Sequence, residues 1–125
     1  MTGATLDAGA LIALDRGDRR MLVLLERARS TGATITVPAT ALAQSIRSPE
    51  RQVRLARLVR QPTTRVVPLD RADASAVGRL LAASGTADIA DAHVVLCAAR
   101  AAQPVVTSDP DDLLRLHPTL DVVAI

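Results

Sequence analysis

Three aspartates stand at positions where carboxylates could bind a divalent cation. Asp7 lies in TLDAGALIAL, Asp109 in VVTSDPDDL and Asp91 in TADIADAHVVLCAA. The first two follow short apolar segments that resemble strands, and reactive groups in an open α/β sheet gather beyond the carboxyl ends of its strands. Carboxylates are hard oxygen ligands that suit Mg²⁺ or Mn²⁺, and a water on such an ion can attack a phosphodiester. The pattern therefore favours metal-dependent hydrolysis.

The same kind of residue also caps helices. Asp109 precedes Pro110, and Asp88 lies three residues before Asp91, so both are natural N-cap residues. Local sequence leaves capping and metal binding open for each of them. Asp7 lies among small and apolar residues with no obvious helix to cap, which favours a chemical role for its carboxylate.

The composition excludes several other kinds of chemistry. All fifteen cationic side chains are Arg, so no catalytic or phosphate-loop Lys is present, and the absence of Phe, Tyr and Trp excludes aromatic base-stacking platforms. Cys97 is the only cysteine and is expected to behave as a small buried hydrophobe. His93 is expected to pack against the fold. The sequence contains no G-x-G-x-x-G, P-loop or nucleophile elbow.

Short β-type segments alternate with helical segments, which predicts an α/β fold with a parallel sheet flanked by helices. At this length one domain over residues 1–125 is expected. The predicted strands are Thr2 to Leu6, Ala33 to Val37, Thr64 to Pro68, Pro104 to Thr107 and Asp121 to Ala124. The predicted helices are Gly9 to Leu14, Arg19 to Arg29, Pro38 to the stop at Ser48, Pro49 to Arg60 with Ser48 as N-cap, Asp70 to Ala83, and Asp88 to Ala101.

Four segments together resemble the motif regions of PIN-domain ribonucleases, and especially the VapC toxins of bacterial toxin–antitoxin pairs. They are TLDAGALIAL, VPATALAQSIR, GTADIADAHVVLCAA and VVTSDPDDL, in the family's order and over nearly the whole chain. The resemblance implies a Rossmann-like PIN domain with a five-stranded parallel sheet and an Mg²⁺- or Mn²⁺-dependent endoribonuclease. It also implies a homodimer and inhibition by a VapB-type antitoxin.

The resemblance also assigns site residues. By motif, Asp7, Asp91 and Asp109 match the catalytic, metal-binding acids, and Asp88 and Asp112 match accessory metal ligands.

One position departs from the family pattern. Many PIN domains have Glu where this chain has Gln44, and an amide can hold a metal or its bound water but adds no charge. Two hypotheses therefore stay open. The chain is either an active endoribonuclease or a PIN-fold module that binds RNA or antitoxin with little catalysis.

Charge and apolar pattern suggest partners and location. The net charge of +2 suits a polyanion, and Arg51 and Arg54, in a row of arginines at three-residue steps, are predicted to bind RNA. Such a row is also typical of a solvated helix face. Apolar helices between Met21 and Leu58 are expected to form the groove for a partner helix. Without a signal-peptide pattern or an apolar run near about 18 to 20 residues, a cytoplasmic protein with no membrane partner is expected.

Overall fold

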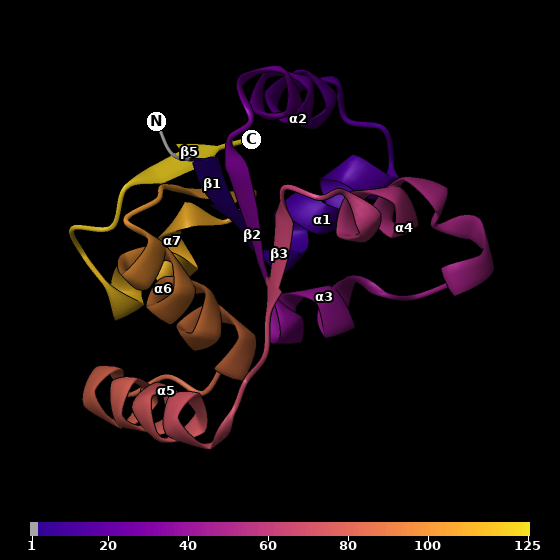
Figure 1. Ribbon diagram of the computed structural model, residues 1–125. Helices are drawn as coiled ribbons and strands as arrows, with labels where there is room; N and C mark the ends of the chain where they lie inside the picture. Colours follow the sequence, from indigo (N-terminus) through magenta and orange to yellow (C-terminus); the bar gives the residue numbers. More distant parts are fainter. Residues whose placement is uncertain (1–2) are drawn as a thin grey trace.

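The computed structural model describes residues 3–125, in which five parallel strands form one sheet (Figure 1). The strands are β1 (Gly3–Leu6), β2 (Thr34–Pro38), β3 (Thr64–Val67), β4 (Val105–Thr107) and β5 (Val122–Ala124). Their order is β3-β2-β1-β4-β5, and all neighbours are parallel. The chain therefore adds β2 and β3 on one side of β1, and then returns to add β4 and β5 on the other side. The carboxyl ends of β1 and β4 form the switch point at which such sheets place ligands.

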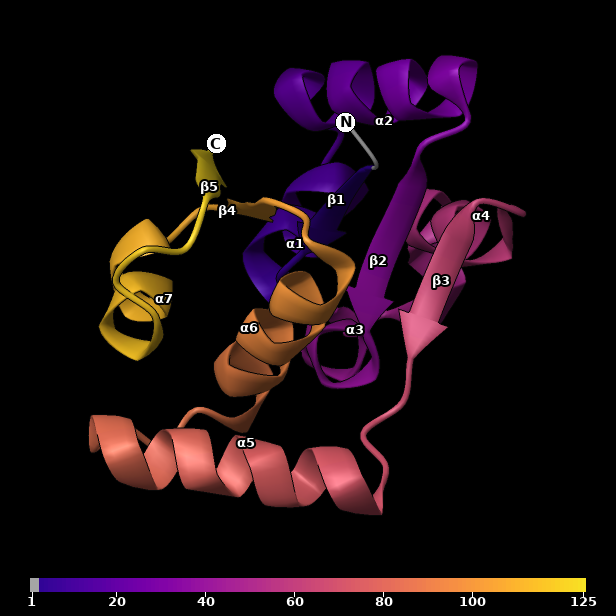
Figure 2. The ribbon, with the colours of Figure 1, turned by 60° about the vertical axis from the view of Figure 1, so that its left-hand side comes forward.

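Helices cover both faces of this sheet. They are α1 (Ala8–Asp15), α2 (Arg19–Thr31), α3 (Ala39–Ser45), the 3₁₀ helix η1 (Pro49–Arg51), α4 (Val53–Arg60), α5 (Arg71–Ser84), α6 (Ile89–Ala101) and α7 (Pro110–Leu116). Helices α6 and α7 lie on one side of the sheet and α1 and α4 on the other (Figure 1). Helix α2 lies across the amino-terminal end, and α5 lies beyond the carboxyl end (Figure 2). The predicted α/β fold with a five-stranded parallel sheet is confirmed.

No single helix within residues 3–125 has the length and apolar composition needed to cross a membrane. Helices α5 and α6 satisfy those criteria only as a pair bent by 110°.

The predicted strands match the observed ones with small shifts at their ends. Thr2, which was predicted to begin the first strand, lies outside the described residues. Pro38 was predicted to begin a helix, but it ends β2 and lies opposite Val67 of β3. A proline is tolerated at a strand end because its missing N–H removes little from the ladder.

The predicted helix over residues 49–60 is interrupted at Gln52. The backbone of Gln52 is not helical (φ −93°, ψ 61°), so η1 ends before α4 begins. Ser48, predicted as N-cap, makes no capping hydrogen bond. The Gln52 side-chain oxygen instead accepts the backbone N–H groups of Arg47 and Ser48, at 2.9 and 3.2 Å. Gln52 thus fixes the segment that precedes η1, and no described side chain caps the first turn of η1.

The core is aliphatic and is centred on the two strands that precede candidate acids. Strands β1 and β4 are buried along their whole length, as expected for central strands of a parallel sheet. The largest fully buried aliphatic side chains include Leu6, Leu11, Met21, Val37, Val94, Val105, Val106 and Leu113. The edge strand β3 is partly exposed. The switch point therefore rests on the best-packed part of the sheet.

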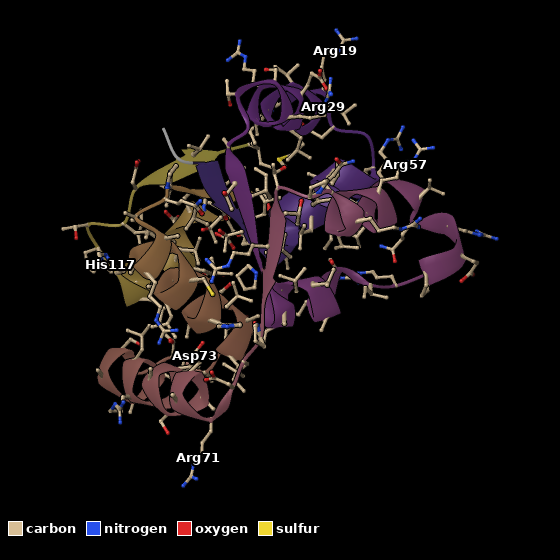
Figure 3. The ribbon with its side chains drawn as sticks, viewed as in Figure 1. Arg19, Arg29, Arg57, Arg71, Asp73 and His117 are labelled. Carbon is tan, nitrogen blue, oxygen red and sulfur yellow. The ribbon has the colours of Figure 1, made fainter. Side chains whose placement is uncertain are left out.

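An ion pair joins α5 to α6. Asp73 is almost completely buried, with 5% of its side chain exposed, and its carboxylate lies 2.6 Å from the Arg100 guanidinium, which is 54% exposed. Asp73 faces α6 from α5 (Figure 3). Because Arg100 lies in the last turn of α6, this pair fixes α5 against that end of the helix.

Arg100→Ala is expected to destabilise the protein by about 2 kcal/mol, because it leaves the Asp73 carboxylate buried without its partner. The loss should be below that of a fully buried pair because Arg100 is half-exposed. The matched control is Arg29→Ala, which removes an arginine from the exposed pair with Glu26 and should change stability little. Urea unfolding of both variants measures the difference, and equal stabilities would contradict the assigned role of the pair.

A candidate acidic metal centre at the carboxyl edge of the sheet

Asp7 is buried at the carboxyl end of β1, with 6% of its surface exposed. Its Oδ1 accepts the backbone N–H of Ala10 at 2.8 Å, so Asp7 is the N-cap of α1. The expectation that Asp7 has no helix to cap is wrong, because α1 begins immediately after it. The capping hydrogen bond uses one carboxylate oxygen of Asp7 and fixes this side chain at the switch point of the sheet.

The environment of Asp7 makes its negative charge costly. Burial raises the pKa of Asp7 above its ordinary value, because the charged form loses solvation. Hydrogen bonds from the Thr107 side chain and from the backbone of Ala10 and Gly9 lower the pKa, while the nearby charge of Asp109 raises it further. The net shift of the pKa is upward, so the negative charge of Asp7 is unfavourable by itself and a bound cation would stabilise it.

Asp109 follows β4 and occupies the N-cap position of α7. Its side chain makes no capping hydrogen bond within the described chain, so the capping interpretation is wrong for this residue. Asp109 is held by its backbone instead, because its N–H donates to the Thr107 hydroxyl at 2.9 Å. The carboxylate is exposed at the edge of the sheet.

Thr107 links the two strand ends and was missed by the sequence analysis. It is fully buried at the end of β4, contacts the Asp109 backbone and hydrogen-bonds to Asp7. Gly9 shows how closely these loops approach: an added Cβ would collide with the Ser108 hydroxyl and lie 3.4 Å from Asp7 Oδ1. The only sequence signal for Thr107 was a hydroxyl residue that ends a buried strand two positions before a candidate acid.

Asp91 interacts electrostatically with the other four candidate aspartates. Asp88 caps α6 by accepting the Asp91 N–H at 2.9 Å, which confirms its predicted capping role. Burial is the largest cause that raises the pKa of Asp91 to about 6, followed by the negative charges of Asp88, Asp112, Asp7 and Asp109. The other four aspartates predicted as metal ligands therefore all lie within electrostatic reach of Asp91.

The five aspartates fit a hard divalent cation in chemistry and place. Each is the N-cap or a first-turn residue of α1, α6 or α7, so three helix N-termini meet at one edge of the sheet. Within residues 3–125, no three Asp, Glu, His or Cys side chains already lie close enough to hold a metal as they stand. Asp112, for example, is half-exposed and lies 3.5 Å from Arg115. Mutual repulsion separates such carboxylates, and a cation would relieve it.

Of three other predicted residues, Arg51 and Arg54 lie away from this acidic edge. Gln44 is exposed on α3, and no hydrogen bond in the described part of the chain joins it to the five aspartates. Arg51 lies on η1 and Arg54 on α4, where Arg54 donates to the Asp15 carbonyl at 3.4 Å. Because Asp15 is the last residue of α1, whose first turn is capped by Asp7, both arginines lie near the opposite end of that helix. The row expected beside the acids is therefore displaced from them.

His93 and Cys97 have structural roles on α6. His93 is fully buried, and its Nδ1 lies 2.7 Å from the Thr40 hydroxyl on α3, which joins the two helices. Burial raises the pKa of the Cys97 thiol to about 11, so no thiolate is present near neutral pH. Both residues pack as expected from the sequence.

Comparisons with known proteins agree with this architecture. The family model for the PIN domain matches residues 4–117. A search among curated protein sequences gives no significant match. Among solved structures, FitAB bound to an IR36 DNA fragment is 15% identical, with a TM-score of 0.67 and coverage of 97% of this chain and 94% of that one.

Two further structures have the same fold. VapBC2 from Rickettsia felis, bound to a DNA fragment from its promoter, is 14% identical with a TM-score of 0.66, and 98% of each chain is covered. FitAcB from Neisseria gonorrhoeae is 16% identical with a TM-score of 0.63, and 95% of each chain is covered. The family match spans most of the chain and includes the segments that carry Asp7, Asp91 and Asp109. The chain belongs to the PIN-domain family.

Proposed function

We propose that this protein is a VapC-type toxin, an Mg²⁺- or Mn²⁺-dependent endoribonuclease that hydrolyses RNA and is inhibited by a VapB-type antitoxin. The observation that carries the proposal is the group of five aspartates, in which neighbouring charges help to raise the pKa of Asp91 to about 6. Membership of a family of nucleases supports hydrolysis. Structural neighbours described as FitAB and VapBC2 support a place in a toxin–antitoxin pair.

In this proposal, Asp7, Asp91 and Asp109 hold the cation, with Asp88 and Asp112 as accessory ligands. When bound, Mg²⁺ or Mn²⁺ would supply Lewis acidity and a water of lowered pKa for the hydrolysis of a phosphodiester. Thr107 keeps the first and last of the three catalytic acids in register by bonding to both. Gln44 is an accessory residue that can orient water but supplies no charge. This last feature is the reason to keep a weakly catalytic RNA- or antitoxin-binding module as the alternative.

Asp7→Asn, Asp91→Asn and Asp109→Asn are each expected to lower metal-dependent RNA cleavage by about a hundredfold or more, because each removes a charged ligand. The fold should survive, since Asn at position 7 can still accept the Ala10 N–H as an N-cap. Asp111→Asn is the matched control, because Asp111 is exposed in the first turn of α7 and carries the same charge.

Cleavage rates on the RNA target and melting curves of all four variants are the measurements. Full cleavage by any two of the three site variants would contradict the assigned site. If the wild type binds RNA in a metal-dependent way and never cleaves it, the module hypothesis replaces the enzyme.

Asp91→Asn is also expected to raise the melting temperature without added metal by about 4 °C at pH 7.5, because it removes a charge that is partly buried and is repelled by its neighbours. The ordinary pKa of 3.8 becomes about 6 in the folded protein, so folding favours the protonated form. This contribution to stability is fully present below about pH 4 and is lost as the pH rises through about 6. The advantage of Asp91→Asn should therefore disappear near pH 4.

Added Mn²⁺ supplies the second part of this test. It should raise the melting temperature of the wild type and of Asp111→Asn, and raise that of Asp91→Asn much less. Equal responses to Mn²⁺ in all three proteins would argue against Asp91 as a ligand.

The antitoxin part of the proposal is supported by the exposure of α2. Residues 21–25 read MLVLL, and five consecutive apolar residues face every side of a helix, a pattern typical of buried helices. Yet Met21 alone of these is buried, while Leu22 and Val23 are 41% and 46% exposed.

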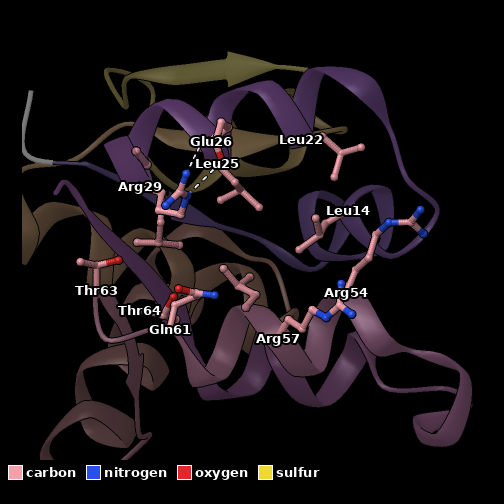
Figure 4. A pocket seen from close by; sticks show the side chains of 13 residues that line it. Leu14, Leu22, Leu25, Glu26, Arg29, Arg54, Arg57, Gln61, Thr63 and Thr64 are labelled. Atoms are coloured by element: carbon pink, nitrogen blue, oxygen red, sulfur yellow. Dashed lines mark hydrogen bonds and ion pairs between the residues drawn. The ribbon is translucent and has the colours of Figure 1, made fainter. Parts of the chain in front are cut away.

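A groove of about 330 Å³ lies beside α2, and Leu22 and Leu25 of this apolar segment line part of it (Figure 4). Its apolar lining is formed by Leu14, Leu22, Leu25, Ala28, Ile35 and Leu58. Arg54 and Arg57 from α4 lie along the opposite wall. The location fits the groove expected between Met21 and Leu58. We assign an apolar helix of the antitoxin to this groove. The proposal also includes a homodimer of this protein.

Leu22→Glu is expected to weaken binding of the antitoxin by about tenfold or more, because a charge would be buried in an apolar contact. Val23→Glu is the matched control, since its side chain is equally exposed and lines a different hollow on the other flank of α2. The partner for this measurement is the proposed VapB-type antitoxin. Calorimetric titration that finds both variants equally affected, or neither, would contradict the assigned groove.

A further inference from the structure

A basic hollow of about 280 Å³ lies where α1 and α3 end. Ile12, Asp15, Arg16, Ser45, Arg47, Ser48, Arg51 and Gln52 line it. Three arginines and one aspartate therefore line this hollow. We call the group formed by Arg16, Arg47, Arg51 and Gln52 the arginine pocket.

Gln52 organises the loop that carries Arg47. Gln52 is only 6% exposed, and its side-chain oxygen accepts the N–H groups of Arg47 and Ser48. Its side-chain nitrogen donates to the Ser45 carbonyl at 2.8 Å and lies 3.4 Å from Asp15 Oδ2. A buried amide thus uses both its donor and its acceptor groups to fix this loop. Arg47 is presented from a preorganised backbone, which lowers the entropy cost of binding a ligand.

The arginines of this pocket lack carboxylate partners. The ion pairs within residues 3–125 involve Arg20, Arg29, Arg100 and Arg115, and none involves Arg16, Arg47 or Arg51. The nearby Asp15 carboxylate lies beside the Gln52 amide. Planar guanidinium groups bind phosphate oxygens through paired hydrogen bonds, so their chemistry fits a phosphodiester.

The pocket is connected to the acidic edge by two helices. Helix α1 begins after Asp7 and α3 begins after β2, both at the carboxyl ends of their strands, and both end at the pocket. Eight helical residues span about 12 Å, so the pocket lies that far along α1 from the cap. A few nucleotides of an extended strand cover such a distance.

We propose that the arginine pocket binds a backbone phosphate of the RNA strand, a few nucleotides from the bond at the acidic edge. The identity of that strand rests on the proposed function. A second hollow of about 270 Å³ shares Asp15 and Arg51 and adds Arg54 and Arg57, which extends the basic surface along α4. Arg57 projects from α4 on this side of the molecule (Figure 3).

The test measures binding of a short, fluorescently labelled single-stranded RNA to the full chain carrying Asp109→Asn, so that cleavage plays no part. Arg47→Gln in this background should weaken binding about fivefold and lower the slope of log K against log salt by about 0.7. Arg71→Gln is the matched control, because Arg71 is also exposed and points away from the body at the start of α5 (Figure 3). Arg47 does not line the α2 groove, so antitoxin binding should be unaffected by its loss.

Gln52→Ala adds a test that leaves the charge unchanged. It should weaken RNA binding about threefold without changing the salt slope, because the loop loosens while every arginine remains. Equal RNA affinities for Arg47→Gln and Arg71→Gln would overturn the proposal.

Inorganic phosphate distinguishes a small-anion site. If Arg47→Gln abolishes phosphate binding and leaves RNA binding intact, the pocket serves a free anion and the RNA proposal is wrong. Because the readout is binding, it also separates this inference from the catalytic proposal. Weakened RNA binding in Arg47→Gln, together with full cleavage by the site aspartate variants, would retain the pocket and refute the active site.

Discussion

The concentration of negative charge at one edge of the sheet is the constraint on which the rest of this structure depends. Asp7, Asp88 and Asp109 occupy the N-cap positions of α1, α6 and α7, and Asp91 and Asp112 lie in the first turns of α6 and α7. The positive ends of three helix dipoles thus face carboxylates that repel one another. This favourable term does not cancel the cost of burial and of repulsion, which together raise the pKa of Asp91 to about 6. The wholly buried strands β1 and β4 supply the rigid base that such an arrangement requires.

The sequence predicted the fold and the place of the acids because both follow from local pattern. Short buried strands alternate with helices, and the carboxyl-end rule places Asp7 and Asp109 together without knowledge of any contact. The caps at Asp70 and Asp88 were also predictable, because each acid precedes a clear helical pattern and accepts an N–H three residues later.

The details that the sequence did not predict depend on side-chain contacts that no simple sequence pattern signals. Asp7 caps a helix whose start consists of small residues with no helical pattern, and Asp109 is held by Thr107 instead of capping α7. The interruption at Gln52 has the same origin, because its side chain bonds to Ser45 and approaches Asp15, which is distant in the chain. Arg51 lies on η1 and Arg54 and Arg57 lie on α4, yet all three line one hollow with Asp15, so the arginine row continues across this interruption.

Partner binding and catalysis use opposite ends of the sheet in the proposed function. Helix α2 lies across the amino-terminal end, while the aspartates lie at the carboxyl end (Figure 2). The groove beside α2 is lined by Leu14, Arg54 and Arg57, and the arginine pocket begins at the neighbouring residues Asp15 and Arg16. A partner seated in the groove is therefore adjacent to the pocket and about the length of α1 from Asp7.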